Sequence, residues 1–343
     1  MSDLNFQPDI PAPYLVYLGD VTDEACCKTG FGLAHWASER TIGQFRSNED
    51  TVSVGLCDMT LKEAVAAGAK SLIIGISDVG GYLSQSWHGD LIKAANAGLN
   101  IVSGGHQKLA EIPGLPDAAA KAGVKLVEIR NPKINFPVGT GIKRTGHRLL
   151  TVGTDCALGK KYTALTIARE MCTRGINAHY RATGQTGIMI AGSGIAVDSV
   201  ISDFVSGAAE VLSPAADADH WDIIEGQGSL IHPGYAAVTL GLLHGSQPDE
   251  IILCHDPRHK CIQDSPQVKI PPLLEVIELY LVMGRLTNPE IRCSGISLNT
   301  QSMTDKERND ALASVRDETG LIVFDPVATG AGELIDYLEE TSC

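Results

Sequence analysis

Residues 153 to 160 read Gly-Thr-Asp-Cys-Ala-Leu-Gly-Lys, and they constrain the fold more than any other stretch of the chain. An apolar run, Leu149 to Val152, precedes them, and a helical pattern, Tyr162 to Ala168, follows them. A strand, a glycine-bounded loop ending in Gly-Lys and a helix form the arrangement that holds phosphate, because backbone N–H groups and the helix N-terminus face the anion and the lysine adds charge. The sequence therefore predicts a phosphate-binding loop between a strand and a helix.

The loop departs from its common form in two ways. Five residues, instead of four, separate the first glycine from the Gly-Lys pair. Lys161 stands where a nucleotide hydrolase carries the Ser or Thr that ligates magnesium; Thr163, about one turn further along the helix, could substitute. We expect the loop to hold a phosphate without necessarily cleaving it. The residues expected to contact the phosphates are Gly153, Thr154, Asp155, Cys156, Ala157, Leu158, Gly159, Lys160, Lys161, Tyr162 and Thr163.

Length and composition favour a two-domain α/β protein of the cytoplasm. The 343 residues suffice for two domains of ~100–200 residues each. No apolar run approaches the roughly 20 residues that span a bilayer, and no basic region with an apolar core begins the chain. Nine cysteines without framework spacing indicate reduced intracellular thiols.

The net charge of −14 argues against nucleic acid or an anionic membrane as a partner. An anionic ligand must therefore be attracted by local cations, of which Lys160 and Lys161 are the clearest pair. We expect a small-molecule substrate and a homo-oligomer.

Strand-length apolar runs alternate with helical patterns along the chain, which predicts parallel sheets covered by helices. In a Rossmann-like N-terminal domain, 1–130, strands are expected at 14–18, 52–56, 71–76, 100–103 and 125–129, and helices at 61–67, 90–97 and 116–122. A linker rich in Pro, Gly and Lys is expected at 131–146. In a P-loop domain, 147–343, strands are expected at 148–152, 178–182, 222–225, 250–254, 292–298 and 321–324, and helices at 159–174, 197–211, 235–244, 272–283, 305–318 and 331–339.

Three further segments stand at the carboxyl ends of predicted strands, where ligands bind in such folds. The first, Arg181 to Ile188, is rich in glycine; its arginine could bind a carboxylate or phosphate, or form a surface ion pair. The second, Glu225 to Leu230, begins with an acid that could hold a metal, accept a proton or brace a loop. Burial would raise the pKa of that acid and Lys160 would lower it, so the sequence leaves the direction open.

The third segment, His255 to His259, contains two histidines and Arg258. Pro257 interrupts the helix that would align the two histidines, so no metal is expected there, and Arg258 is expected to contact an anion. The substrate contacts expected from these segments are Arg181, Gln185, Thr186, Gly187, Gln227 and Arg258.

These segments together resemble one family. The loop pattern Gly-Thr-Asp-x-x-x-Gly-Lys is similar to that of dethiobiotin synthetases. Followed by Arg-Ala-Thr-Gly-Gln-Thr-Gly, Glu-Gly-Gln-Gly-Ser-Leu and His-Asp-Pro-Arg-His, it resembles a two-domain P-loop family that includes the D-glutamate N-acetyltransferases of bacterial D-amino-acid catabolism. Lys28-Thr29, Gly32-Leu33 and Ser103-Gly104-Gly105-His106 are also similar to that family, so the resemblance covers nearly the whole chain.

The resemblance implies an acyltransferase that moves the acetyl group of acetyl-CoA to the amino group of D-glutamate, with no metal requirement. The acceptor ammonium must lose a proton before it attacks, and the candidate bases are Glu225, Asp155 and His232, in that order. Asp155 could equally cap the helix. An acetyl-Cys156 intermediate is not expected, because no histidine is fixed beside it in sequence. The rival functions are a kinase or ligase acting on a small carboxylate with ATP and magnesium, and a non-catalytic nucleotide- or CoA-binding module.

Overall fold

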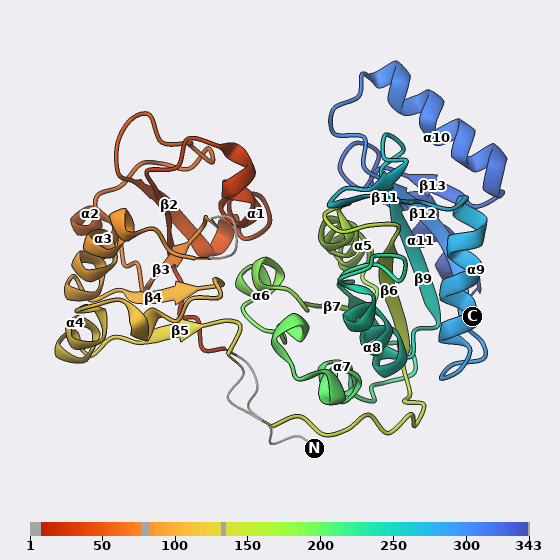
Figure 1. Ribbon diagram of the computed structural model, residues 1–343, viewed down its shortest axis with the longest axis horizontal. Coiled ribbons are helices and arrows are strands. Elements are labelled where there is room, and N and C mark those ends of the chain that lie inside the picture. The colour runs from red at the N-terminus through yellow and green to blue at the C-terminus, as the bar shows by residue number, and fades with distance from the viewer. Residues whose placement is uncertain (1–7, 77–81, 132–134, 342–343) are drawn as a thin grey trace. The chain divides into compact units, whose positions relative to one another are not determined.

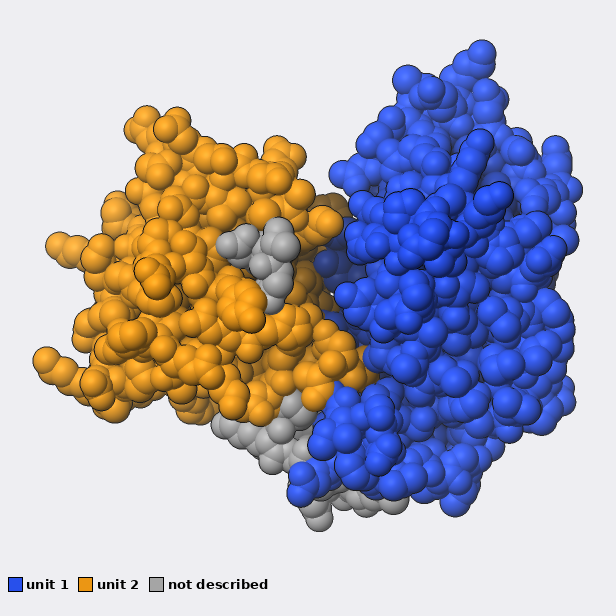
Figure 2. Space-filling model, in the orientation of Figure 1, with its two compact units in different colours: residues 1–3, 135–184, 200–343 blue, residues 4–134, 185–199 orange. Residues whose placement is uncertain are grey.

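The computed structural model describes residues 8–76, 82–131 and 135–341, and the chain divides into two compact units (Figure 1 and Figure 2). The N-terminal unit comprises residues 4–134 together with 185–199, and the C-terminal unit comprises residues 1–3, 135–184 and 200–343. Residues 185–199, predicted as part of the P-loop domain, group with the N-terminal unit instead. Among the described residues, no helix has both the length and the apolar character needed to cross a membrane.

The N-terminal unit contains a parallel sheet of five strands in the order β2-β1-β3-β4-β5. The strands are β1 (Tyr14–Gly19), β2 (Thr41–Arg46), β3 (Ser71–Ile74), β4 (Asn100–Ser103) and β5 (Leu126–Glu128). The helices are α1 (Lys28–Trp36), α2 (Leu61–Ala66), α3 (Gln85–Asn96), α4 (Leu115–Ala122) and, from much later in the chain, α6 (Gln185–Ala191).

One strand of this sheet differs from the prediction. Residues 52–56 form no strand; they belong to a loop in which the N–H of Val54 is held by the side chain of Gln44 at 2.9 Å. Gly55, with φ +83°, breaks the extended backbone there. The strand beside β1 is β2, an edge strand whose polar residues concealed it in the sequence.

The C-terminal unit contains a parallel sheet of six strands in the order β13-β12-β9-β6-β8-β7. The strands are β6 (His147–Gly153), β7 (Ala178–Arg181), β8 (Trp221–Ile224), β9 (Glu250–His255), β12 (Arg292–Leu298) and β13 (Ile322–Phe324). A hairpin of β10 (Cys261–Ile262) and β11 (Ser265–Lys269) follows β9. The helices are α5 (Lys160–Thr173), α7 (Val205–Leu212), α8 (Ala236–Ser246), α9 (Leu273–Gly284), α10 (Asp305–Thr319) and α11 (Gly332–Thr341). The helix expected over 197–211 forms only from Val205; two short 3-10 turns precede it.

Alternating residues of the central strands fill two separate cores of the C-terminal unit. Leu149 packs with α5 and α11, whereas its neighbour Leu150 packs with α8 and α9. On β8, Ile223 and Ile224 divide between the two cores in the same way. Because successive side chains of a strand point to opposite faces, this pattern places helices on both faces of the sheet. The carboxyl ends of the strands stay at one edge, where their loops meet.

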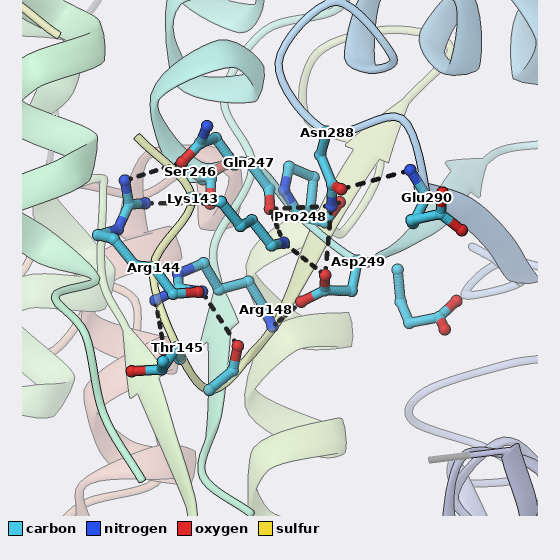
Figure 3. A network of polar contacts seen from close by, with 12 residues as sticks. Lys143, Arg144, Thr145, Arg148, Ser246, Gln247, Pro248, Asp249, Asn288 and Glu290 are labelled. Atoms are coloured by element: carbon cyan, nitrogen blue, oxygen red, sulfur yellow. Dashed lines mark hydrogen bonds and ion pairs between the residues drawn. The ribbon is translucent and has the colours of Figure 1, made fainter. Parts of the chain in front are cut away.

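A polar network at the other end of β6 fixes the segment that leads into the C-terminal unit (Figure 3). The buried guanidinium of Arg148 donates to main-chain carbonyls of Arg144, Thr145 and Pro214 at 2.9–3.1 Å. Asp249 accepts the N–H of Arg148 at 2.9 Å and pairs with the ammonium of Lys143 at 2.5 Å. These bonds satisfy carbonyls that turns and chain crossings would otherwise leave without donors.

Candidate active site

The loop between β6 and α5 lies at the carboxyl edge of the sheet, next to the ends of β8 and β9. Gly159 adopts φ +103°, a conformation that favours glycine, and Ala157 has φ +54°. The first bond of this helical turn runs from the N–H of Thr163 to the carbonyl of Gly159. The N–H groups of the preceding helical residues therefore have no partner from within the helix, and no acid stands in the first turn. This end of α5 carries a partial positive charge suited to an anion.

Contacts from distant elements brace the first residues of the loop. The hydroxyl of Tyr280, on α9, donates to the carbonyl of Gly153 at 2.8 Å and accepts the N–H of Leu230 at 3.1 Å. The hydroxyl of Thr154 lies 2.9 Å from Nδ1 of His255, whose pKa burial lowers to about 4. Tyr280 was not among the predicted site residues, because the sequence marks it only as a tyrosine within an apolar helix.

Lys160 is buried at the start of α5, and its Nζ donates to the carbonyl of Asp155 at 2.7 Å. Burial lowers the pKa of this lysine, while the nearby cysteines Cys254 and Cys156 and the acids Asp155 and Glu225 act in the opposite direction. The ammonium therefore lies close to two acids and points back across the loop.

Thr163 does not present its hydroxyl as a substitute magnesium ligand. The hydroxyl lies 2.8 Å from that of Ser297 on β12 and 3.4 Å from the sulfur of Cys254 on β9, and it donates to the carbonyl of Gly159 at 3.2 Å. These contacts direct it toward the sheet. Since Lys161 occupies the usual hydroxyl position, neither residue offers the hydroxyl ligand for magnesium that the ATP-dependent rival function predicts.

Glu225 follows β8 and is buried beside the loop. Its Oε2 accepts the backbone N–H groups of Thr183 at 2.9 Å and Gly184 at 3.0 Å. Burial raises the pKa of Glu225 above its ordinary 4.5, and the opposing effects of Lys161 and of the two N–H bonds are smaller. The structure therefore gives the direction of the pKa shift that the sequence left open. A carboxyl at this position holds a proton more readily than one in water.

The side chain of Asp155 braces the loop with both of its oxygens. Oδ1 accepts the N–H of Cys156 at 2.6 Å, and Oδ2 accepts the N–H of Gln263, from the β10–β11 turn, at 2.8 Å. Burial raises the pKa of the Cys156 thiol, with Lys160 opposing that rise. Asp155 thus links the loop to the hairpin.

His232 lies against the loop and completes a cluster with Asp155 and Cys156. A ring nitrogen, a carboxylate oxygen and the thiol sulfur of these residues lie within 4.8 Å of one another, a spacing that could hold a metal ion. Nδ1 of His232 accepts the N–H of Gly234 at 3.0 Å, and its Nε2 is buried without a hydrogen-bond partner among the described residues. Because Nδ1 acts as the acceptor, the neutral ring carries its proton on Nε2. That tautomer favours a donor over a metal ligand at Nε2.

The residues expected to contact the substrate fall into two groups. In the C-terminal unit, Nε of Arg181 pairs with the buried Asp222 at 2.6 Å, Arg258 pairs with the buried Asp256, and Gln227 donates to the hydroxyl of Thr183 at 3.0 Å. The two arginines therefore already have carboxylate partners. The other predicted contacts, Gln185, Thr186 and Gly187, begin α6 in the N-terminal unit, where the hydroxyl of Thr186 lies 2.7 Å from that of Thr29.

A parallel sheet whose first strand runs through a glycine-bounded loop and Gly-Lys into a helix defines a P-loop protein, here joined to a Rossmann-like unit. The chain belongs to the DUF1611 family: residues 137–335 match its C-terminal P-loop domain and residues 43–132 its N-terminal Rossmann-like domain, both described as domains of unknown function. The predicted family and fold are confirmed.

Similar proteins carry a more specific name. The chain is 43% identical over 329 residues to a D-glutamate N-acetyltransferase of Tritonibacter scottomollicae, and 43% identical over the same length to one of a Pseudoalteromonas species. Each alignment covers 96% of this chain and 99% of the relative. A crystal structure of a DUF1611 family protein from Anabaena variabilis superposes with a TM-score of 0.87 at 32% identity, covering 96% of this chain and 100% of that one. The named relatives confirm the prediction of an acyltransferase.

Proposed function

We propose that this protein transfers the acetyl group of acetyl-CoA to the amino group of D-glutamate. The names of the two relatives support this activity. The observation that carries it in this chain is the position of Glu225: a buried carboxyl with a raised pKa stands beside a lysine and the N-terminus of α5. A base whose pKa lies closer to neutrality suits the removal of a proton from an ammonium group.

The transfer then needs no covalent intermediate on the protein. The carboxylate of Glu225 takes one proton from the substrate ammonium, and the freed lone pair forms the C–N bond at the acetyl carbonyl carbon. The C–S bond breaks, and the departing thiolate takes the second proton from nitrogen. Glu225 returns its proton to water, so the products are the amide, the free thiol of CoA and one proton.

The half-buried thiol of Cys156 is a poorer candidate for carrying the acetyl group. Burial raises its pKa, which disfavours the thiolate. The tautomer set by Gly234 also leaves the Nε2 of His232 protonated, and this nitrogen therefore cannot take the thiol proton. Direct transfer of the acetyl group from CoA to the amine is therefore the simpler mechanism.

Thiol release tests the proposal. Purified protein with acetyl-CoA should release CoA thiol with D-glutamate and much less with L-glutamate, and mass spectrometry should find N-acetylglutamate. Calorimetric titration with acetyl-CoA, and with ATP plus magnesium, should show binding of the first. Turnover of ATP with a carboxylate substrate, or no thiol release with any D- or L-amino acid, would refute the acetyltransferase.

A further inference from the structure

The loop brings opposite charges close together. The ammonium of Lys160 and the N-terminus of α5 provide the positive side. The carboxylates of Asp155 and Glu225 provide the negative side, and both act on the charge of Lys160. An α-amino acid carries the matching pair, a carboxylate and an ammonium on one carbon. A diphosphate would match only the positive side and would lie next to two buried acids.

The length of acetyl-CoA gives a second argument. Its thioester is separated from its diphosphate by the whole pantetheine arm. For Glu225 to act on the amine, amine and thioester must meet beside it with reacting atoms about 3–3.5 Å apart. A diphosphate in the loop would lie next to Glu225 and place the thioester far from this base. The acceptor and the CoA phosphates therefore compete for the same place, and the base assignment favours the acceptor.

The metal ligand of diphosphate-binding loops is also missing from its usual place. Enzymes that transfer phosphoryl groups in such loops use magnesium to offset the phosphate charge. Here the position after Lys160 is a lysine, and the hydroxyl of Thr163 is directed to Ser297. A singly charged carboxylate needs no such ion beside Lys160.

His232 supplies an independent sign of a ligand. The residue is 5% exposed, and its Nε2 has no partner in the described part of the chain. The N–H of Gly234 fixes Nδ1 as an acceptor and leaves Nε2–H as a donor. A buried donor without an acceptor costs free energy, and an anion held in the loop would supply the acceptor. The ring also packs against that of Tyr235, with centroids 4.6 Å apart and planes tilted by 36°, which limits its rotation.

We propose that the loop binds the α-carboxylate of the acceptor amino acid and not a phosphate of CoA, with Lys160, the N-terminus of α5 and the Nε2–H of His232 as its donors. This inference rests on the proposed function, and it assigns the substrate subsite. The α-ammonium then faces Glu225, and the acetyl thioester reaches the same place from a CoA whose phosphates bind elsewhere. The inference also gives His232 the role of a donor in place of the base role considered from the sequence.

An acetyl donor that lacks phosphates distinguishes a loop that binds the α-carboxylate of the acceptor from a loop that binds a phosphate of CoA. Lys160→Met is assayed with acetyl-CoA and with S-acetylpantetheine, which lacks the diphosphate and the nucleotide. Loss of a charge-assisted contact to the carboxylate should lower kcat/KM for D-glutamate by about 10- to 100-fold, and equally with both donors. A loss with acetyl-CoA and none with S-acetylpantetheine would place a phosphate in the loop and overturn the proposal.

His232 gives a second test. His232→Ala should raise KM for D-glutamate by about 10-fold, and His232→Gln, whose amide can donate, should restore much of the loss. In the wild type, ¹⁵N-resolved NMR of the imidazole should report the Nε2–H tautomer and a shift of that proton on adding D-glutamate. A ring protonated on Nδ1, or a proton that D-glutamate does not move, would contradict the donor role.

Binding measurements keep this inference separate from the proposed reaction. If the wild type releases no thiol with either donor, the acetyltransferase fails, but calorimetry can still locate the carboxylate. D-glutamate that binds the wild type and not Lys160→Met, with CoA binding changed by less than about 3-fold, supports the subsite. D-glutamate binding that is indifferent to Lys160→Met rejects it, provided circular dichroism shows that the variant is folded.

Discussion

The carboxylate of Glu225 accepts the backbone N–H of Thr183 at 2.9 Å, and the same oxygen accepts that of Gly184 at 3.0 Å. Hydrogen bonds of this kind favour the ionised form, yet burial outweighs them and the pKa of Glu225 is raised. The group is therefore held in place as a carboxylate while its affinity for a proton increases. A rigid base with a raised pKa has consequences for stability and for catalysis, and the two can be measured separately.

The stability of the C-terminal unit should depend on pH through Glu225. A carboxyl whose pKa is raised by folding stabilises the folded state fully at a pH below its pKa in the unfolded chain, near 4.5. That stabilisation is lost as the pH rises through the pKa of the group in the folded state. Glu225→Gln cannot ionise and escapes this loss. The free energy of unfolding of the variant, relative to wild type, should therefore increase as the pH rises above 4.5 in urea titrations. A difference that is constant with pH would show that the pKa of Glu225 is not raised.

The catalytic consequence is a pH-dependent loss of activity when Glu225 is replaced. If Glu225 is the base, kcat/KM should rise with pH as this carboxyl ionises, and Glu225→Gln should lower turnover by about 10²- to 10⁴-fold and remove that rise. Glu225→Asp retains a carboxylate and serves as the control, with a partial loss due to its shorter reach. Unchanged turnover of Glu225→Gln across the pH range would remove Glu225 from the mechanism.

The sequence predicts the C-terminal sheet better than its neighbour, for a physical reason. Central parallel strands such as β6 and β9 are buried on both faces, so they appear as continuous apolar runs followed by glycine or polar turns. The strand β2 lies at an edge and carries Gln44 and Arg46, so no apolar run marks it. The helix α6 was also missed, because its glycines suggested a ligand-binding loop.

In the candidate active site, too, the sequence predicts only those residues that a local pattern marks. The loop and Glu225 could be found because a motif or a strand end marks each of them locally. Tyr280 braces Gly153 from 127 positions away, and Asp155 meets Gln263 across 108 positions. Such contacts depend on the tertiary fold and leave no trace in the spacing of nearby residues. The pairing of Arg181 with Asp222, across 41 positions, was foreseen only as an unspecified ion pair.

Gly226, directly after Glu225, should not tolerate a side chain. A Cβ at this position would lie 1.6 Å from the carbonyl oxygen of Thr151 and 3.1 Å from Cδ of Lys160. Gly226→Ala must therefore displace the backbone of β6 or of the turn, and we expect a loss of about 3–5 kcal/mol in unfolding free energy. Gly234→Ala is the matched control, since its Cβ meets only the ring of His232 at 3.6 Å. Equal stabilities of the two variants in urea titrations would contradict the close approach seen here.

Arg148 should contribute to stability without contributing to the chemistry, because it lies at the opposite end of β6 from the loop. Its guanidinium is buried and donates to main-chain carbonyls that include those of Gly146 at 3.1 Å and Thr145 at 2.9 Å. Arg148→Met removes these donors and should cost about 2–4 kcal/mol. Lys143→Ala, in the same network but with its ammonium at the surface, should cost less than about 1 kcal/mol. At a temperature where Arg148→Met remains folded, kcat should match the wild type; a large fall in kcat there would show that this network also positions the loop.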